Sequence, residues 1–534
     1  MKIISAQDTP DLSACVIGIE LGSTRIKAVL VGSDRRPLAS GSFEWENRFE
    51  NGYWTYSLSD AREGLRSCYA ALKADLKEKY GVTLDRVGAI GVSGMMHGYL
   101  VFDRELRQIY PFVTWRSTVT AEESELLTGL LGVHIPQRWS AAHLLKAVRN
   151  GEEHLNRLSL LTTLSGYIHL LLTGHSVIGV GEASGMFPVD PETLDFDKEK
   201  AAAFDRETEK LGHPLHIRKL LPEVLPAGEC GGFLSEDGAR FLDPDGDLKA
   251  GIPFAPPESD AGTGMISTNT VRLRTGNISM GTSGFVLLVT DKKIGVNRRV
   301  DQLMTPAGLP TALVQCNNCT TDINSWIGIF SEFSALLGQN IDRDRLFSLL
   351  FEKALEGDPS CGGLISYNYF SGEHITDCAE GRPVFARPAD RALTLADFWR
   401  THLYSTLAAI RIGLDILKSE YGIEADTLCG HGGFFRTPRV GQLIVSAAAG
   451  VPVTVRESAG EGGPYGMALL AAYMLDRKNG STVSLEDYLD EIFVPVPSST
   501  LCAEQKDMQG FTEYVERYKK SLPVEQEAIR TMRG

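Results

Sequence analysis

The stretch at residues 256–284 constrains the fold most, because it places an acidic residue close to a glycine-rich turn. Asp260 directly precedes a run with two glycines at residues 261–265, and a strand-like run at 277–280 ends in Gly-Thr-Ser-Gly at 281–284. Such a turn between apolar strands lets backbone N–H groups and hydroxyls converge on an anion. A nearby carboxylate makes chemical sense if the anion is a phosphate and the carboxylate takes a proton from the group attacking it. The alternative is a tight hairpin after a surface Asp.

A second turn of this kind lies near the N-terminus. The apolar run at residues 16–19 leads through Glu20 into Gly-Ser-Thr at 22–24, and an apolar strand resumes at 28–31. This pattern predicts a hairpin with an acid on its entering strand. The two turns form a weak internal repeat, as two duplicated lobes would leave, although Gly-Ser/Thr turns are common enough to recur by chance.

Length and composition favour a globular protein of two large domains. The chain has 534 residues, and its 43% hydrophobic and 23% charged content matches ordinary soluble domains. A Gly- and Pro-rich region at residues 225–255 suggests a boundary near its end, which gives domains at 1–252 and 253–534.

Charge, cysteine content and hydropathy exclude several classes of protein. The formal net charge of −15 argues against a surface for nucleic acid or anionic membrane. Nine cysteines in this length make no disulfide framework, so we expect a cytoplasmic location. We expect no signal peptide, and no apolar run reaches the roughly 18 residues that span a bilayer.

Further candidate ligand-binding segments follow strands. A buried strand at residues 87–92 runs into the loop 93–98, where His97 is either a site residue or a core histidine bonded to backbone. Cys316 and Cys319 form a lone CxxC, which we interpret as ordinary because no second ligand pair follows at metal spacing.

Two glycine clusters in the last quarter predict contact with a flat ligand. One lies at residues 430–433 after a strand, and the other lies at 457–466 before a helix expected at 467–475. Glycine lets backbone approach a nucleobase closely, although tight helix–strand packing would use the same residues. Long helices are expected at 60–80 and 394–421, and the region 120–225 is expected to be mostly helical.

These motifs, taken in order, resemble the FGGY family of carbohydrate kinases over nearly the whole chain. Residues 20–27 resemble the first phosphate loop, 281–284 the second, and 430–433 the adenosine loop. The loop at 93–98 is similar to the sugar-contacting loop of ketopentose kinases, and residues 371–373 resemble a short family motif. The resemblance implies an α/β, two-lobed, actin-like ATPase (ribonuclease H-like) fold with the active site in the cleft between two domains.

The resemblance also assigns roles to residues. Asp260 would be the catalytic base, and Glu20 and Asp260 would hold Mg²⁺ through water. The residues implied to bind ATP are Gly22, Ser23, Thr24, Lys27, Gly281, Thr282, Ser283, Gly432, Gly433 and Phe434. The residues implied to bind the sugar are Met96, His97, Trp115, Asp260 and Ala261.

Three positions depart from the family pattern. Glu20 stands where Asp is usual, which lengthens the acid by one methylene and alters the metal–water geometry. The run Arg116-Ser117-Thr118 lacks the acid that often follows Trp115, and residues 434–438 differ from the common xylulokinase loop. The chain therefore resembles a ketopentose kinase between xylulokinase and L-ribulokinase, with a slight preference for L-ribulose over D-xylulose.

The function implied is transfer of the γ-phosphate of ATP to a hydroxyl, expected to be O5, of a ketopentose in pentose catabolism. Closure of the lobes would bring ATP onto the sugar and limit wasteful hydrolysis. The alternatives are a kinase for another sugar or polyol, an actin-like ATPase switch, a sugar-binding regulator without activity, or a structural α/β protein. The partners expected are the sugar and ATP, without nucleic acid or membrane, and a homodimer is left open.

Overall fold

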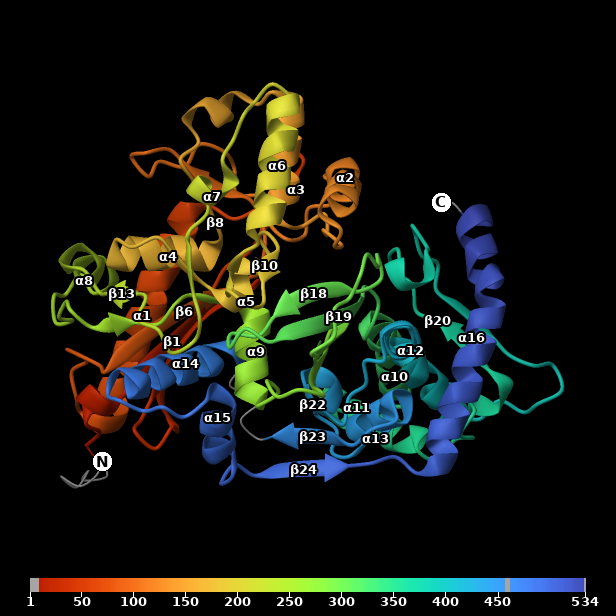
Figure 1. Ribbon diagram of the computed structural model, residues 1–534. Helices are drawn as coiled ribbons and strands as arrows, with labels where there is room; N and C mark the ends of the chain where they lie inside the picture. The colour runs from red at the N-terminus through yellow and green to blue at the C-terminus, as the bar shows by residue number, and fades with distance from the viewer. Residues whose placement is uncertain (1–8, 457–461, 533–534) are drawn as a thin grey trace. The chain divides into compact units, whose positions relative to one another are not determined.

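The computed structural model describes residues 9–456 and 462–532 (Figure 1). Its contacts divide the chain into two compact units, each built from segments that are far apart in sequence. Unit 1 comprises Met1–Val271, Ile294–Thr311 and Glu461–Pro495, and unit 2 comprises Arg272–Lys293, Ala312–Gly460 and Val496–Gly534. The boundary expected at 252/253 is a simpler division, because it assigns residues 253–271, 294–311 and 462–495 to the second half, whereas they belong to unit 1.

A seven-stranded sheet forms the centre of unit 1, in the order β13-β14-β6-β1-β2-β3, with β15 also paired to β6. β1 (Val16–Leu21) and β2 (Arg25–Val31) form the antiparallel hairpin predicted from the sequence. β6 (Ala89–Gly94) runs parallel to β1, and β15 (Glu258–Ser259) runs parallel to β6. The other strands of the sheet are β3 (Pro37–Glu44), β13 (Gly232–Phe233) and β14 (Pro253–Phe254).

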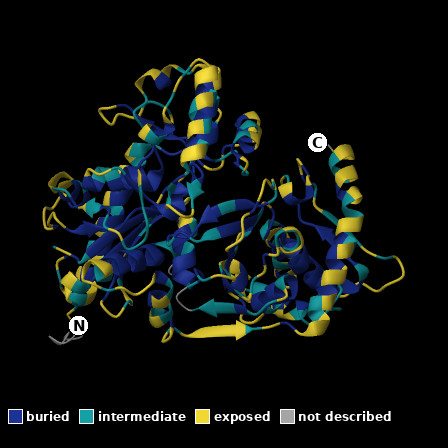
Figure 2. Cartoon of the chain, in the orientation of Figure 1, coloured by how far each residue is buried: buried dark blue, intermediate teal, exposed yellow. Residues whose placement is uncertain are grey.

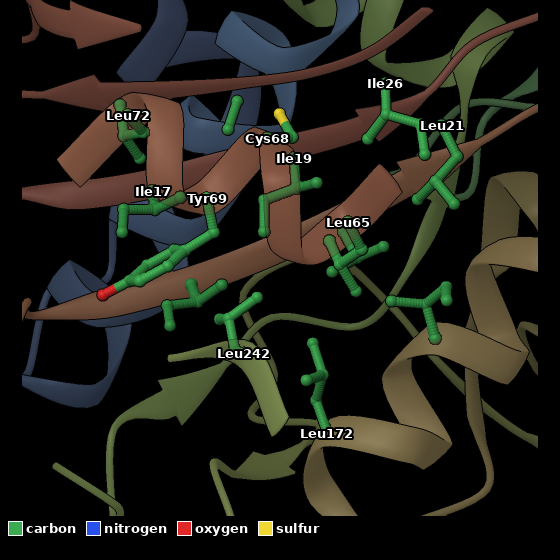
Figure 3. Close-up of a cluster of buried hydrophobic side chains, with 14 of the residues drawn as sticks. Ile17, Ile19, Leu21, Ile26, Leu65, Cys68, Tyr69, Leu72, Leu172 and Leu242 are labelled. Carbon is green, nitrogen blue, oxygen red and sulfur yellow. The ribbon is translucent and has the colours of Figure 1, made fainter. Parts of the chain in front are cut away.

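Helices α1 and α14 cover opposite faces of this sheet. α1 (Leu58–Tyr80) packs on the face that carries Ile17 and Ile19, where a cluster of buried side chains forms the core (Figure 3). Gly18 points to the other face, where a Cβ would overlap the carbonyl oxygen of Pro464 in α14 (Gly462–Lys478). Figure 1 shows α14, in blue, beside the red strands from the start of the chain. Figure 2 shows most of α14 as buried.

The helix expected at residues 60–80 is α1, and its ends follow from local chemistry. Ser57 caps its N-terminus by accepting a hydrogen bond from the Ser59 N–H, and Gly81 ends it with a left-handed backbone of φ +72°. Leu65 and Leu72 are fully buried against the sheet, and each stabilises the fold by about 1.5–3 kcal/mol.

The remaining elements of unit 1 surround this sheet. The region 120–225 contains helices interrupted by five short strands, so it is less helical than expected. The helices within this region are α2 (Ala121–Leu131), α3 (Ser140–Asn150), α4 (Leu164–Thr173), α5 (Val180–Ala183), α6 (Lys198–Lys210) and α7 (Ile217–Leu220). The other helices of unit 1 are α8 (Glu236–Leu242), α9 (Asp260–Thr268) and α15 (Leu485–Phe493). The five strands within 120–225 are β8 (Leu160–Thr162), β9 (Val177–Gly179), β10 (Val189–Asp190), β11 (Asp195–Phe196) and β12 (Glu223–Leu225). The other strands assigned to unit 1 are β4 (Arg48–Glu50), β5 (Tyr53–Thr55), β7 (Leu100–Phe102) and β18 (Asp301–Met304).

Unit 2 is also built around a sheet. The strands lie side by side in the order β19 (Pro310–Cys316), β17 (Gly284–Val289), β16 (Thr275–Met280), β22 (Thr427–His431), β23 (Val453–Arg456) and β24 (Ser498–Leu501). β16 and β17 form an antiparallel hairpin, and β16 runs parallel to β22. The strands β20 (Ile365–Tyr367) and β21 (Val384–Ala386) pair separately with each other. The helices of unit 2 are α10 (Thr321–Leu336), α11 (Arg343–Ala354), α12 (Leu395–Tyr421), α13 (Val440–Ala449) and α16 (Gln505–Thr531).

The long helix expected at residues 394–421 is α12, which packs against α11, α13 and α16. Within the described ranges, no helix combines the length and apolar composition that crossing a bilayer requires. The glycine cluster expected at 457–466 lies partly outside the described residues, and only its end, from Gly462, is described as the start of α14.

Candidate active site

Three parallel strands of unit 1 end at the same level and gather the candidate residues of the N-terminal half. In the strand pairing, Glu20 of β1 lies opposite Ser93 of β6, and Ser259 of β15 lies opposite Gly94 of β6. The carboxyl ends of β1, β6 and β15 therefore carry, in turn, Glu20, the loop after Gly94, and Asp260. Open α/β sheets bind their ligands at this end.

Asp260 occupies the first turn of α9, which Ser259 caps by accepting a hydrogen bond from the Gly262 N–H. Oδ1 of Asp260 accepts hydrogen bonds from the Met96 N–H at 3.2 Å and the Ala261 N–H at 3.0 Å. Restricted hydration raises the pKa of Asp260 to about 6, while the N–H donors oppose that rise. The residue is exposed, so water screens part of this effect, but a carboxylate with a raised pKa is a stronger proton acceptor.

Glu258, the other acidic residue near the start of the stretch 256–284, is buried and bonded to backbone. Glu258 is 2% exposed, and its carboxylate accepts hydrogen bonds from the backbone N–H groups of Gly181 and Glu182 at the start of α5. Burial raises the pKa of Glu258 to about 7, against the effect of these donors. Asp260 is thus the accessible carboxylate of the two.

Glu20 is half-buried beside the first phosphate loop. Burial raises the pKa of Glu20 to about 7, and repulsion from Asp260 makes a smaller contribution in the same direction. The positive charge of Lys27 opposes this rise. Lys27 lies directly across the hairpin from Glu20 in the β1–β2 pairing. The family resemblance implies that Lys27 binds ATP, and in the structure Lys27 lies opposite Glu20.

The first phosphate loop is held by two aromatic residues that the sequence analysis missed. Nε1 of Trp45 donates a 2.7 Å hydrogen bond to the carbonyl of Gly22, and the hydroxyl of Tyr56 donates a 2.6 Å bond to the carbonyl of Ser23. The rings of Trp45 and Tyr56 contact each other with centroids 4.4 Å apart. The side chains of Ser23 and Thr24 are exposed, which leaves their hydroxyls accessible to an anion.

His97 is buried in a conformation that fixes its tautomer. Nδ1 lies 3.0 Å from the carbonyl oxygen of Gly185. A carbonyl only accepts, so Nδ1 carries the proton and Nε2 of neutral His97 is an acceptor. Burial lowers the pKa of His97 to about 3, so the ring is neutral at ordinary pH. Its backbone has φ +73°, and Gly98 follows with φ +102° where a Cβ would lie 2.7 Å from the carbonyl oxygen of Val113.

The other candidate sugar-binding residues differ in what the structure shows. Met96 is buried and bonds Asp260 through its backbone, and Ala261 follows Asp260 in α9. Trp115 is 37% exposed, with the guanidinium of Arg116 6.0 Å from its ring centroid. Among the described residues, no hydrogen bond or ring contact joins Trp115 to His97 or Asp260. Asp260, Met96 and His97 thus lie together at the ends of β6 and β15. Trp115 stays a predicted sugar-binding residue without a contact to them in the described part of the chain.

In unit 2, the second phosphate loop and the adenosine loop follow adjacent parallel strands. Ser279 of β16 lies opposite His431 of β22, so the loops at 281–283 and 432–433 leave the sheet side by side. A Cβ at Gly432, which has φ +98°, would lie 2.6 Å from the carbonyl oxygen of Met280. Gly281, Thr282, Ser283, Gly432 and Gly433 are all exposed. This end of unit 2 thus offers backbone and hydroxyl groups to a ligand.

Phe434 and His431 are less available than their neighbours. Phe434 is 2% exposed and packs against Phe351 with ring centroids 5.7 Å apart, so its side chain belongs to the core. Nε2 of His431 lies 3.1 Å from Oδ1 of Asn277, and burial lowers the pKa of His431 to about 4.

The CxxC segment supports the second phosphate loop. The Cys319 N–H donates a 3.0 Å bond to the carbonyl of Thr282, and Thr320 donates to the carbonyl of Gly281 from its N–H and its hydroxyl. Both thiols are buried, and burial raises their pKa values, so they remain uncharged.

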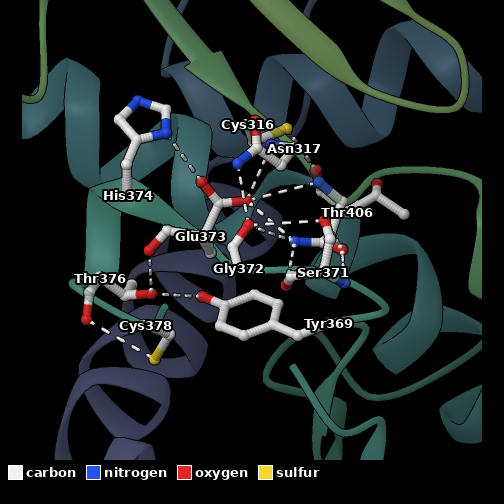
Figure 4. Close-up of polar contacts among 11 residues, drawn as sticks. Cys316, Asn317, Tyr369, Ser371, Gly372, Glu373, His374, Thr376, Cys378 and Thr406 are labelled. Carbon is white, nitrogen blue, oxygen red and sulfur yellow. Dashed lines mark hydrogen bonds and ion pairs between the residues drawn. The ribbon is translucent and has the colours of Figure 1, made fainter. Parts of the chain in front are cut away.

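Glu373 holds this supporting segment in place, as Figure 4 shows. Its Oε2 accepts a 2.9 Å hydrogen bond from the Asn317 N–H and a 3.3 Å bond from Nδ2 of Asn318. Glu373 has no exposed surface, and burial raises its pKa to about 7 against the effect of these donors. The sequence motif at 371–373 therefore acts on the phosphate loop through Asn317 and Asn318.

Comparison with known families identifies the class of protein. Residues 15–262 match the N-terminal domain of the FGGY family of carbohydrate kinases, and residues 276–475 match the C-terminal domain of that family. The chain belongs to the FGGY family and is an ATP-dependent phosphotransferase that acts on a carbohydrate. The family, the two-domain actin-like α/β fold and the enzyme class predicted from the sequence are confirmed.

Individual relatives share the fold at low sequence identity. A xylulose kinase of Lactococcus lactis is 21% identical over 92% of this chain and 94% of its own length. A crystal structure described as a xyloylose kinase from Brucella ovis has a TM-score of 0.77 and 20% identity, over 96% of this chain and 99% of that one. A gluconate kinase structure from Lactobacillus acidophilus has the same TM-score of 0.77 at 15% identity, covering 96% and 98%. The fold thus serves more than one acceptor.

Proposed function

We propose that this kinase transfers the γ-phosphate of ATP to a hydroxyl of a ketopentose, with Asp260 as the general base. The observation that carries the proposal is the bond from the Met96 N–H to Oδ1 of Asp260, which ties the candidate base to the loop containing His97. Among the described residues, no hydrogen bond from another residue is assigned to Oδ2, so this oxygen is available to a substrate hydroxyl.

The acceptor side of the reaction follows from the hydrogen-bonding roles of these residues. Oδ2 of Asp260 takes the proton as the hydroxyl oxygen attacks the γ-phosphorus, the bond to the β-phosphate oxygen breaks, and ADP leaves. Neutral His97 offers Nε2 as an acceptor to a second sugar hydroxyl. A buried acceptor of this kind favours a polyhydroxy substrate over an analogue that lacks the hydroxyl.

The phosphate groups are assigned to the exposed loops. Thr282 and Ser283 would donate their hydroxyls and N–H groups to phosphate oxygens, and Gly432 and Gly433 would lie against the adenosine. Trp45 and Tyr56 would hold the backbone of the first loop through the carbonyl groups of Gly22 and Ser23. The exposed hydroxyls of Ser23 and Thr24 would then donate to phosphate oxygens.

The carboxylates of Glu20 and Asp260 fit a magnesium ion bound with the phosphates. Both are hard oxygen ligands at the ends of β1 and β15, the two strands that flank β6, and the repulsion of Glu20 by Asp260 would fall beside a cation. Magnesium there would neutralise charge on the phosphates. Among the described residues, no group of three or more His, Cys, Asp and Glu could hold a metal by itself, so substrate phosphates would complete the ligand set.

D-Xylulose and L-ribulose are the first acceptors to test. The resemblance in the sequence slightly favours L-ribulose, whereas the xylulose kinases among the similar proteins favour D-xylulose. An assay of ADP release should compare both with D-ribulose, gluconate, glycerol and a hexulose. We expect one ketopentose to have the highest kcat/KM. A preference for gluconate or glycerol would replace the ketopentose, and ATP hydrolysis indifferent to every acceptor would favour an ATPase switch.

A further inference from the structure

The carboxylate of Glu20 is confined by two glycines of unit 1. A Cβ at Gly22 would lie 3.3 Å from Oε1 of Glu20, and a Cβ at Gly463 would overlap Oε2. Gly22 belongs to the first phosphate loop, and Gly463 lies in the first turn of α14. The carboxylate thus occupies the space that any side chain at position 463 would need.

The backbone of α14 has no room to yield to a larger residue at 463. A Cβ at Gly18 of β1 would overlap the carbonyl oxygen of Pro464, and a Cβ at Gly466 would overlap the carbonyl oxygen of Thr263. These contacts hold the helix directly against β1 on one side and α9 on the other. Packed backbone of this kind does not shift freely. A methyl group at 463 must therefore displace the movable end of Glu20.

We propose that Gly463 is a positioning residue matched to Glu20, so that a side chain at 463 is compatible only with a shorter acid at position 20. The inference rests on the proposed function, in which the Glu20 carboxylate faces magnesium and phosphate. Aspartate is shorter than glutamate by one carbon–carbon bond, about 1.5 Å, so its carboxylate would withdraw from the space beside Gly463.

Two general considerations explain why Gly463→Ala should act on activity through the Glu20 carboxylate. Magnesium demands near-ideal geometry at short distances, so a small shift of a carboxylate matters. Alanine is a better helix former than glycine, and Gly463 has no left-handed backbone that would resist it. Local helix energetics alone would therefore make Gly463→Ala harmless.

The experiment compares Gly463→Ala, Glu20→Asp and the double variant with the wild-type kinase on its best acceptor. A misplacement of about 1 Å can cost 10²-fold in rate, so we expect Gly463→Ala to lower kcat by about 10²-fold. We expect the double variant to be more active than Gly463→Ala and about as active as Glu20→Asp alone, because the shorter acid leaves room for the methyl group. Gly129→Ala is the control, because Gly129 is an exposed glycine inside α2 with no atom within 4 Å of a built Cβ.

A structural measurement separates this inference from the proposed function. Crystal structures of wild-type and Gly463→Ala protein should show the Glu20 carboxylate displaced and the backbone of α14 unmoved, whatever the acceptor is. Normal turnover of Gly463→Ala, an unmoved Glu20, or a loss that Glu20→Asp does not relieve would overturn the inference. If Gly463→Ala fails to fold, a folded double variant supports the pair and an unfolded one overturns it. A wild-type enzyme inactive on every pentulose would overturn only the ketopentose proposal.

Discussion

The N–H of Met96 donates a 3.2 Å hydrogen bond to Oδ1 of Asp260, and so links the loop after β6 to the start of α9. The two residues are far apart in sequence but adjacent in space, because β6 and β15 run parallel and end together. The bond orients the carboxylate through one oxygen and leaves the other for chemistry. It also places the adjacent His97 near the candidate base.

Substitution of His97 is expected to affect the sugar and not the nucleotide. His97→Asn removes the imidazole but tolerates the left-handed backbone at φ +73° better than Ala would. The shorter Asn side chain does not reach the position of Nε2, so the acceptor proposed for the sugar hydroxyl is lost and kcat/KM for the best ketopentose should fall by about 10²-fold or more. The measurement is the acceptor kcat/KM beside the slow ATPase rate without sugar.

His216, an exposed residue directly before α7, supplies the control, since His216→Asn should leave both rates unchanged. Equal losses of the two activities in His97→Asn would show that His97 supports the fold or the nucleotide site instead. Because the pKa of His97 is about 3, the wild-type pH profile should show no inflection near 6.5 from this residue.

The second phosphate loop is expected to act on ATP. Replacing both Thr282 and Ser283 with Val removes two exposed hydroxyls and adds apolar bulk where phosphate charge would lie. KM for ATP should rise about tenfold or more, while sugar affinity measured by calorimetry stays near the wild-type value. The matched control exchanges the residues, Thr282→Ser with Ser283→Thr, and keeps both hydroxyls. Loss of sugar affinity with unchanged ATP kinetics would show that the loop binds the other ligand.

Glu373 predicts a pH dependence of stability. Burial raises the pKa of Glu373 to about 7 in the folded protein, above the 4.5 of an ordinary glutamate. The folded state therefore holds the proton more tightly than the unfolded state, so the contribution of Glu373 to stability falls as pH rises from about 4.5 to about 7. Each pKa unit corresponds to about 1.4 kcal/mol of unfolding free energy.

Glu373→Gln keeps an acceptor for the Asn317 N–H and removes the charge. Its unfolding temperature relative to wild type should increase between pH 5 and pH 8, because the wild-type residue becomes charged over this range. The exposed Glu513→Gln in α16 controls for loss of a negative charge. A difference in unfolding temperature that is the same at both pH values would contradict the assignment.

The local parts of this structure were predictable from sequence. Apolar runs flanking Gly-Ser-Thr and Gly-Thr-Ser identified both hairpins, and spacing of apolar residues identified α1 and α12. Asp260 is the candidate base from sequence because it directly precedes a glycine-containing run and lies close to the Gly-Thr-Ser-Gly turn. These signals lie within a few residues of the feature that they predict.

The contacts that shape the site join residues far apart in the chain, and no local pattern predicted them. Gly463 approaches Glu20 from the other end of the chain, and Trp45 and Tyr56 bond the first loop after intervening strands. An aromatic between strands is ordinarily core, so only the folded geometry shows which carbonyl it bonds. Phe434 is a different case: the resemblance implies that it binds ATP, but its side chain is buried although it lies beside a glycine cluster.

The central claim is that Asp260 is the base for a ketopentose hydroxyl, and Asp260→Asn tests it most directly. Asn retains an oxygen that can accept the Met96 N–H, so the fold and the affinities for ATP and sugar should persist in calorimetry and thermal unfolding. With the base removed, kcat on the best ketopentose should fall by about 10²–10⁴-fold. Near-normal kcat in Asp260→Asn would contradict the account.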